Sequence, residues 1–233
     1  MIQTLALAVA MGVATSSFAF ADDYLWSGIY AGVHAGWGAG TVNWVDYSNG
    51  WFTDAANPAH SAKGDGVLGG GHIGVLHHHA NNLVTGVELA ASGLDANTSV
   101  ASAIYTDHTL QTDIDMVATA TARLGYSLGR FLPYVEAGYA GGNIHMRNFD
   151  TNWCAPVLCV FDSKRWHNGF VFGAGTDIRV TGNIIAGLNY RFINLDADDH
   201  QGINQNLGVD EHFGADAQVH SATFRLSWLF NSN

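Results

Sequence analysis

Residues 118–139 read ATATARLGYSLGRFLPYVEAGY, and their spacing decides the fold class. Along 118–126, Ala, Leu and Tyr alternate with Thr, Arg and Gly. The same alternation of faces returns along 134–139, after the short connection 127–132. Successive side chains of a β-strand point to opposite faces, so this spacing predicts two half-buried strands joined by a tight turn.

Six further segments of the chain alternate in the same way. They are residues 29–37, 72–75, 86–91, 170–178, 186–192 and 222–230. The connections between the eight segments alternate in length. Three are short, at about 77–82, 127–132 and 179–183, and four have roughly twenty residues, at about 43–65, 92–111, 143–165 and 195–218. An even number of strands, with short turns at one end and long loops at the other, is typical of transmembrane β-barrels.

We therefore predict an all-β fold: an eight-stranded antiparallel up-and-down transmembrane β-barrel with four long outer loops and three short periplasmic turns. Strands of about ten residues can cross a bilayer at a tilt. Charged residues make up only 12% of the 233-residue chain, about half the usual share of roughly 25%. The formal net charge of −11 argues against a nucleic-acid ligand, because binding phosphate requires a basic surface.

The first residues of the chain predict export. Residues 1–21 contain no Asp, Glu, Lys or Arg, and the apolar run 5–14 is followed by Ala19-Phe20-Ala21. Small residues at these last positions fit a signal-peptidase site, and the run is shorter than the ~20 residues of a membrane-spanning helix. We expect residues 1–21 to be a signal peptide for Sec-type export and residues 22–233 to form one barrel domain.

The two faces of the predicted strands differ in chemistry. One face holds Val, Leu, Ala, Phe, Tyr and Trp, and the other holds Gly, Thr, Asn and mid-strand charges. A membrane barrel turns its apolar face to lipid, whereas a soluble lipocalin-like carrier would turn that face inward. The abundance of Gly on the charged face suits a crowded barrel interior, so we expect the membrane arrangement. The predicted interior residues are the charged Glu88, Arg123, Glu136, Asp177, Arg191 and Arg225, and the polar His34, His72 and Asn189.

These interior charges have two interpretations. An eight-stranded barrel is just wide enough for its own side chains to fill it, and desolvated charges of opposite sign are expected to pair. We therefore expect the three Arg and three acidic residues to form a plug of ion pairs. The alternative is a charged lining around a narrow pore.

Aromatic residues of the apolar face gather near the ends of the predicted strands. Those at the long-loop end are Trp37, Tyr139, Tyr190 and Phe192, and those at the short-turn end are Tyr126, Trp228 and Phe230. Aromatic girdles mark the two lipid–water interfaces of a membrane barrel. The two groups therefore predict where the barrel meets the bilayer surfaces.

Several segments resemble a known family, in order along the chain. Trp26-Ser27-Gly28-Ile29-Tyr30-Ala31-Gly32 resembles the W-x-G-x-Y-x-G opening of small Gram-negative outer-membrane proteins with an OmpA/OmpX-type barrel. Residues 173–177 (GAGTD) and 188–192 (LNYRF) resemble the family's G-A-G-x-E and L-E-Y-R-Y segments. The family includes alphaproteobacterial surface antigens and haemin-binding proteins.

This resemblance implies a place in the cell outer membrane, in contact with lipid and lipopolysaccharide. It also implies insertion by the barrel-insertion machinery, which reads a terminal aromatic residue on the last strand. Here Phe230 is followed by Asn231-Ser232-Asn233, a departure from the family's aromatic end. We expect the barrel to be a monomer.

The only two cysteines are Cys154 and Cys159, in the third predicted long loop. An even number of cysteines in an exported protein predicts a disulfide. A metal or redox pair is the alternative, but the C-x-x-C spacing is absent.

Histidine is abundant, with 12 residues, and imidazole binds haem iron and divalent transition metals. Candidate ligands for haemin or a divalent metal are His77, His78, His79, His145 and His167. The alternative is that these are merely polar residues of turns and loops. We find no G-x-S-x-G, H-E-x-x-H or phosphate-loop motif, so we expect no enzymatic activity.

The sequence thus predicts a structural or surface protein of the outer membrane with a side-chain-filled interior and no cofactor. A haemin or metal receptor that uses loop histidines is the alternative, and a narrow porin is a third hypothesis.

Overall fold

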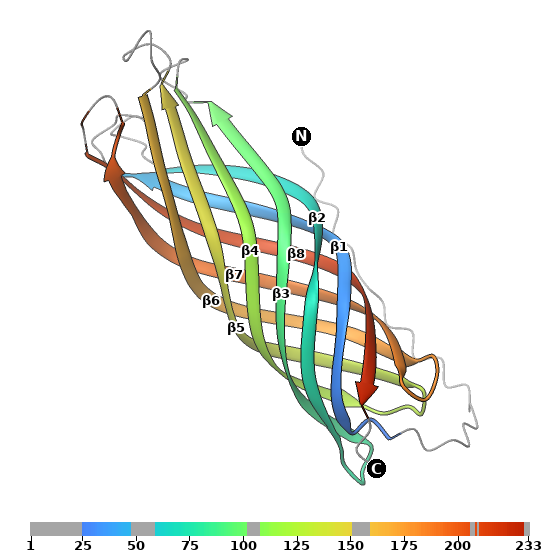
Figure 1. Cartoon of the computed structure of the whole chain (residues 1–233). Helices are drawn as coiled ribbons and strands as arrows, with labels where there is room; N and C mark the ends of the chain where they lie inside the picture. Colours follow the sequence, from blue (N-terminus) through green and yellow to red (C-terminus); the bar gives the residue numbers. More distant parts are fainter. Residues whose placement is uncertain are drawn as a thin grey trace, which may run out of the picture.

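The computed structural model describes residues 25–47, 59–101, 108–150, 159–205, 208 and 210–230. The predicted signal peptide and Cys154 lie outside these residues. The described residues form eight strands, which are β1 (Gly28–Asp46), β2 (Ala59–His78), β3 (Leu83–Ala101), β4 (His108–Tyr126), β5 (Phe131–Asp150), β6 (Cys159–Arg179), β7 (Ile184–Ile203) and β8 (Asp210–Phe230). Each strand pairs antiparallel with the next, and β8 pairs with β1, which closes the barrel (Figure 1). The predicted fold class is confirmed.

Among the described residues, no helix is long and apolar enough to cross a membrane.

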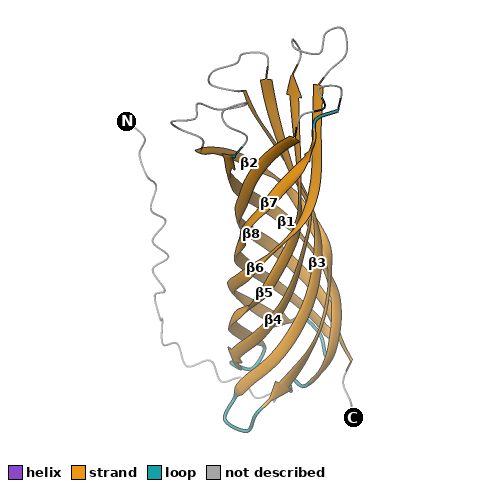
Figure 2. Cartoon of the chain, turned by 90° about the vertical axis from the view of Figure 1, so that its left-hand side faces the viewer, coloured by secondary structure: helices purple, strands orange, loops and turns teal. Residues whose placement is uncertain are grey.

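Three tight turns join the strands at one end of the barrel (Figure 2). They are residues 79–82, 127–130 and 180–183. Asn82 and Gly129 have positive φ angles of 63° and 67°. Such left-handed positions suit Gly and Asn, which explains their place in turns this short.

The predicted bounds of the four long connections are wrong. Strand β1 runs to Asp46 and β2 begins at Ala59, so residues 47–58 lie between them instead of 43–65. The other three connections shrink in the same way, to residues 102–107, 151–158 and 204–209. The strands are 19 to 21 residues long, about twice the length we expected.

The physical reason for this error is that the apolar side chains change sides along the strands, from the outward face in the turn half to the inward face in the outer half. Next to the turns, apolar side chains such as Val33 and Leu226 point outward and are exposed. Farther out, apolar side chains such as Val42 and Trp44 point inward and are buried. A sequence search for one constant apolar face therefore ends each predicted strand where the apolar residues change sides.

The barrel is fully closed only in the half that carries the turns. Strands β2 and β3 pair from the turn up to Leu68↔Leu94, and β6 and β7 pair up to Gly169↔Leu195. Beyond these pairs, one isolated bridge aside, the described strands form two four-stranded sheets. These are β7-β8-β1-β2 and β3-β4-β5-β6, which diverge in the upper left of Figure 1. We call the closed part the turn half and the split part the outer half.

Three β-bulges lie where the turn half gives way to the outer half. The register shifts just after Gly93 in β3, Ile114 in β4 and Leu195 in β7. A bulge bends its strand and increases the local twist. Bending at this common level lets the ring flatten into two sheets.

An apolar core lies between the two sheets of the outer half. At its centre, the ring of Phe213 lies 6.2 Å from that of Trp44 and 5.2 Å from that of Phe161, and all three are fully buried. Sheets that pack face to face bury their inner side chains in this way. The outer half therefore has the interior of a soluble β-sandwich.

Apolar side chains cover the outside of the turn half. The predicted girdle residues Trp37, Tyr139 and Tyr190 are about half exposed at its outer edge, and Tyr126, Trp228 and Phe230 are equally exposed near the turns. Phe192 is only partly exposed, because it packs against Phe170 and His220. Trp166, which we did not predict, joins the outer girdle and donates a 3.2 Å hydrogen bond to Tyr139 Oη. Such an apolar band between two aromatic girdles has the form of a lipid-facing surface.

This arrangement predicts which tryptophans contact lipid. Brominated lipids should quench Trp228, whose side chain is 49% exposed on the band, and should not quench Trp44, which is 1% exposed in the outer core. Trp228→Phe should therefore remove part of the fluorescence quenching in brominated vesicles, and Trp44→Phe should remove none. Equal losses in the two variants would contradict the assignment of the lipid-facing band.

Candidate functional site

Three layers of side chains fill the barrel interior along its axis. Nearest the turns is an apolar layer, whose members are Trp26, Tyr30, Leu76, Val84, Leu132, Ile185 and Leu229. A layer of charged and polar residues follows in the middle of the turn half. The apolar core of the outer half is the third layer.

The middle layer brings together the six charged residues that we expected inside. Arg123 lies 2.9 Å from Glu88 and 3.0 Å from Glu136. Arg191 bridges the same two carboxylates, at 2.7 Å and 2.6 Å. Arg225 forms two further hydrogen bonds to Glu88. Each of these side chains comes from a different strand, so the ion pairs tie together β3, β4, β5, β7 and β8.

Asp177, from β6, is the sixth charged residue of the middle layer. It is buried, and its nearest basic partner is Arg123, at 3.7 Å. Three Arg and three carboxylates then balance in charge. A buried network tolerates this many charges only because each charge has partners.

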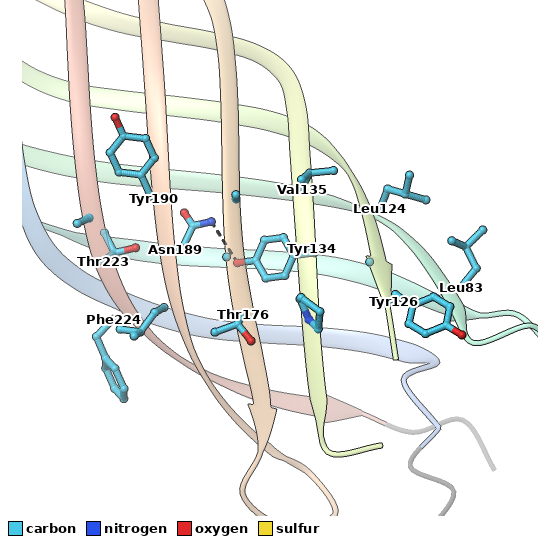
Figure 3. Close-up of a pocket in the computed structure, with 16 residues that line it drawn as sticks. Leu83, Leu124, Tyr126, Tyr134, Val135, Thr176, Asn189, Tyr190, Thr223 and Phe224 are labelled. Atoms are coloured by element: carbon cyan, nitrogen blue, oxygen red, sulfur yellow. Dashed lines mark hydrogen bonds between the residues drawn. The ribbon is translucent and has the colours of Figure 1, made fainter. Parts of the chain in front are cut away.

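Two tyrosines belong to this network, although we had not singled them out. Tyr30 Oη donates a 2.7 Å hydrogen bond to Glu88, and the Arg123 guanidinium lies 4.3 Å from the centre of the Tyr134 ring. Asn189 donates a 3.1 Å hydrogen bond to Tyr134 Oη (Figure 3). It donates a second bond of 3.1 Å to Glu136. Both tyrosines fall on the inward phase of their strands, which is the signal that could have found them.

Glycines make room for these large side chains. A Cβ atom on Gly187 would lie 2.1 Å from Asp177 Oδ1, and a Cβ atom on Gly74 would lie 2.5 Å from Tyr30 Oη. Neither position can carry a larger residue unless the network moves. The abundance of Gly on the inner face is thus a consequence of the filled interior.

His34 and His72 lie beside the ion pairs and form a hydrogen-bonded row with two serines. Their Nδ1 atoms are 3.2 Å apart, and their rings are stacked. His34 Nε2 lies 2.8 Å from Ser92 Oγ, and His72 Nε2 lies 2.7 Å from Ser227 Oγ. A cavity of about 30 Å³ adjoins this row and borders Arg191. It is large enough for one or two water molecules and for nothing bigger.

The five histidines expected to bind haemin or metal lie in three separate places. His77, His78 and His79 lie at the turn between β2 and β3, where the rings of His77 and His79 meet edge to face at 4.5 Å. His145 points outward from β5 and pairs with Asp162 at 3.1 Å. His167 is fully buried on β6. Among the described residues, no group of three or more His, Cys, Asp or Glu is placed to hold a metal ion.

His167 pairs with a histidine that the sequence reasoning missed. Its Nε2 atom lies 2.9 Å from Nε2 of His200, which is also fully buried. His200 falls within the predicted loop 195–218, because the bulge after Leu195 interrupts the period-two pattern of its strand. His200 lies in the outer half, where burial and the neighbouring His167 and Arg165 lower its pKa to about 4. The His200 imidazole is therefore neutral at physiological pH.

A shallow apolar hollow of about 1180 Å³ lies on the outside of the turn half (Figure 3). Leu124, Val135, Leu188 and Phe224 border it, and small residues such as Ala222 form its floor. It belongs to the lipid-facing band and contains no charged side chain.

The predicted disulfide falls partly outside the described residues. Cys159 is fully buried at the first position of β6, and Cys154, its predicted partner, lies outside the described residues. The disulfide stays a prediction.

Comparisons with known proteins agree with this architecture. Residues 5–227 match the family of outer membrane protein beta-barrel domains. The chain is 26% identical to the 25 kDa outer-membrane immunogenic protein of Brucella ovis over 172 residues, which cover 74% of this chain and 71% of the relative. It is 27% identical to the 31 kDa outer-membrane immunogenic protein of Brucella melitensis over 211 residues, covering 88% and 83%.

Among solved structures, the outer membrane protein OprG from Pseudomonas aeruginosa is similar, with a TM-score of 0.53 and 15% sequence identity. The match covers 90% of this chain and 99% of OprG. The outer membrane protease OmpT from Escherichia coli has a TM-score of 0.50 at 9% identity, covering 87% and 97%. At such low identity, these likenesses show the fold alone.

Proposed function

This chain belongs to the outer-membrane β-barrel family and lies in the outer membrane, and from that premise we propose that it is a closed structural barrel that presents its outer half at the cell surface. The observation that carries the proposal is the three-layered interior. Among the described residues, ion pairs fill the middle of the interior and apolar side chains fill both ends, which favours a closed barrel.

The outer half supports the surface role. Its strands extend well beyond the outer aromatic girdle, and it has an apolar core of its own. Charged residues of the outer half, such as Lys63, Asp65 and Lys164, point outward. Charged side chains on exposed sheet edges oppose pairing with other chains, which fits a monomer. Lipid and lipopolysaccharide are then its main contacts, and the proposal includes no catalysis and no cofactor.

Planar-bilayer recording tests this proposal. The purified barrel should produce no stepwise ionic conductance under conditions in which a general porin of known conductance produces clear steps. The physical reason is that the cavity beside Arg191 holds only about 30 Å³ and lies between the ion pairs and the outer core. Reproducible unit steps would overturn the proposal and favour a narrow pore.

A haemin titration, monitored by the Soret absorption band, tests the alternative that the protein is a haemin receptor. Because the five candidate histidines lie in three places, we expect the same response from the barrel as from empty detergent micelles. A saturable one-to-one shift that is lost in His145→Gln or in a variant of 77–79 would instead support a receptor.

A further inference from the structure

The seam between β6 and β7 contains a window without main-chain pairing. The two strands separate beyond Gly169↔Leu195 and meet again only at the bridge between Val160 and Gln205. Between these points, residues 161–168 of β6 face residues 196–204 of β7. We call this stretch the β6–β7 window. Side chains, not a backbone ladder, hold its two edges together.

Three hydrogen bonds cross the window in a continuous row. Ser163 Oγ lies 3.1 Å from His200 Nδ1, the two Nε2 atoms of His200 and His167 are 2.9 Å apart, and His167 Nδ1 lies 3.0 Å from the Asp196 carbonyl oxygen. Ser163 and His167 belong to β6, and His200 and Asp196 belong to β7. Each hydrogen bond therefore links one edge of the window to the other.

The row sets the tautomer of both rings. The Asp196 carbonyl can only accept, so His167 carries its hydrogen on Nδ1 and its Nε2 has a free lone pair. For the two rings to share a hydrogen, His200 donates through Nε2–H, and its Nδ1 then accepts from the Ser163 hydroxyl. The ring centres are 5.2 Å apart and the rings are tilted by 27°, so the two Nε2 atoms point at each other across the window.

We propose that the two Nε2 atoms of His167 and His200 form a binding site for a divalent transition-metal ion of the imidazole-preferring class, Cu²⁺ or Zn²⁺. The ion would take the place of the single hydrogen that the two rings share. The hydrogen on His200 would move to Nδ1 and be donated to Ser163 Oγ, which can accept it. The hydrogen is relocated and not released, so this exchange loses no proton.

The geometry is close to what such an ion requires. Ligand atoms about 2.0–2.1 Å from a tetrahedral ion are about 3.3 Å apart. The observed separation of 2.9 Å is a few tenths of an ångström shorter. The rings must also turn so that both lone pairs face the ion, and a seam without a backbone ladder can open by that amount. Oxygen partners already hold both Nδ1 atoms, as in histidine sites where the outer hydrogen bond orients the ligand.

The charged surroundings set the strength and selectivity of the site. The Asp198 carboxylate acts on His200 and favours a cation, whereas the Arg165 guanidinium opposes one. Because the described residues supply only two ligands, the remaining positions of the ion would have to be filled by water that enters through the opened window. With imidazole ligands, affinity should follow the general order in which Cu²⁺ exceeds Zn²⁺. A bound ion would clamp the window and stabilise the outer half, a property that goes beyond the proposed structural role.

The experiment uses the full barrel in detergent, in a background in which His77→Gln, His78→Gln and His79→Gln remove the turn histidines. Cu²⁺ and Zn²⁺ should bind one per barrel in calorimetry and raise the Tm as their concentration increases, because an ion that binds only the folded state stabilises it. The electron paramagnetic resonance spectrum of Cu²⁺ should show two nitrogen ligands.

Three variants decide the outcome. His167→Gln should weaken binding at least tenfold and remove one nitrogen from the Cu²⁺ spectrum. His145→Gln, the matched control on the outer face of β5, should change neither. Ser163→Ala keeps both ligands but removes the hydroxyl that orients His200, so it should weaken binding about tenfold even if His167→Gln fails to fold. A Cu²⁺ spectrum that is unchanged in His167→Gln, or the absence of saturable binding in the parent, would overturn the proposal.

Discussion

Replacing Glu88 with Ala should lower the free energy of unfolding by about 3–5 kcal/mol, or prevent folding altogether. Glu88 is the carboxylate on which the network converges: it is 2% exposed, lies 2.9 Å from Arg123 and 2.7 Å from Arg191, and binds Arg225 as well. Removing it leaves three buried guanidinium groups with two carboxylates. A buried charge that loses its partner retains its desolvation cost, which is why the effect is large.

Urea unfolding of the refolded barrel in detergent measures this loss. The matched control is Asp115→Ala, which breaks an ion pair with Lys164 whose side chains are 41% and 48% exposed. Exposed pairs contribute about 0–1 kcal/mol, so this variant should unfold close to the parent. If Glu88→Ala stays within 1 kcal/mol of the parent, the middle layer does not hold the barrel together.

Replacing Phe213 with Ala should cost about 3–5 kcal/mol and loosen the outer half selectively. The Phe213 side chain is completely buried between Trp44 and Phe161, and its loss leaves a cavity that the two sheets cannot close without moving. The turn half does not contain this core. Limited proteolysis should therefore cut the outer half of the variant first, while the turn half stays protected.

Phe224→Ala is the control, because Phe224 lies on the same strand, β8, but is 56% exposed on the lipid-facing band. Its removal leaves no interior cavity and should leave the protease pattern unchanged. Cleavage that begins in the turn half of Phe213→Ala, or equal losses of stability in the two variants, would show that the halves do not behave as separate packing units.

Much of the turn half could be predicted from the sequence. Arg123 and Glu136 lie on the same phase of strands joined by one short turn, so their pairing across β4 and β5 follows from alternation alone. The lipid-facing positions follow for the same reason, since lipid on one side and a crowded interior on the other impose opposite chemistry on alternate residues.

The outer half could not be predicted in the same way. Its buried face is apolar, whereas the buried face of the turn half is polar, so residues such as Trp44 and His200 looked like parts of loops. The split into two sheets also leaves little signal in the local sequence. It depends on which neighbouring strands stop pairing, and not on the composition of any single strand.

By itself, the sequence determined the class of fold, the number and order of the strands and the identity of the interior charges, because alternation is a local property that each strand displays alone. Only the tertiary structure decided that the barrel splits beyond the outer girdle and that His167 meets His200. Such contacts depend on the register between strands: Glu88 and Arg225 are 137 residues apart, and His167 and His200 are 33 apart. Register is set by how all eight strands close on one another, which no single segment encodes.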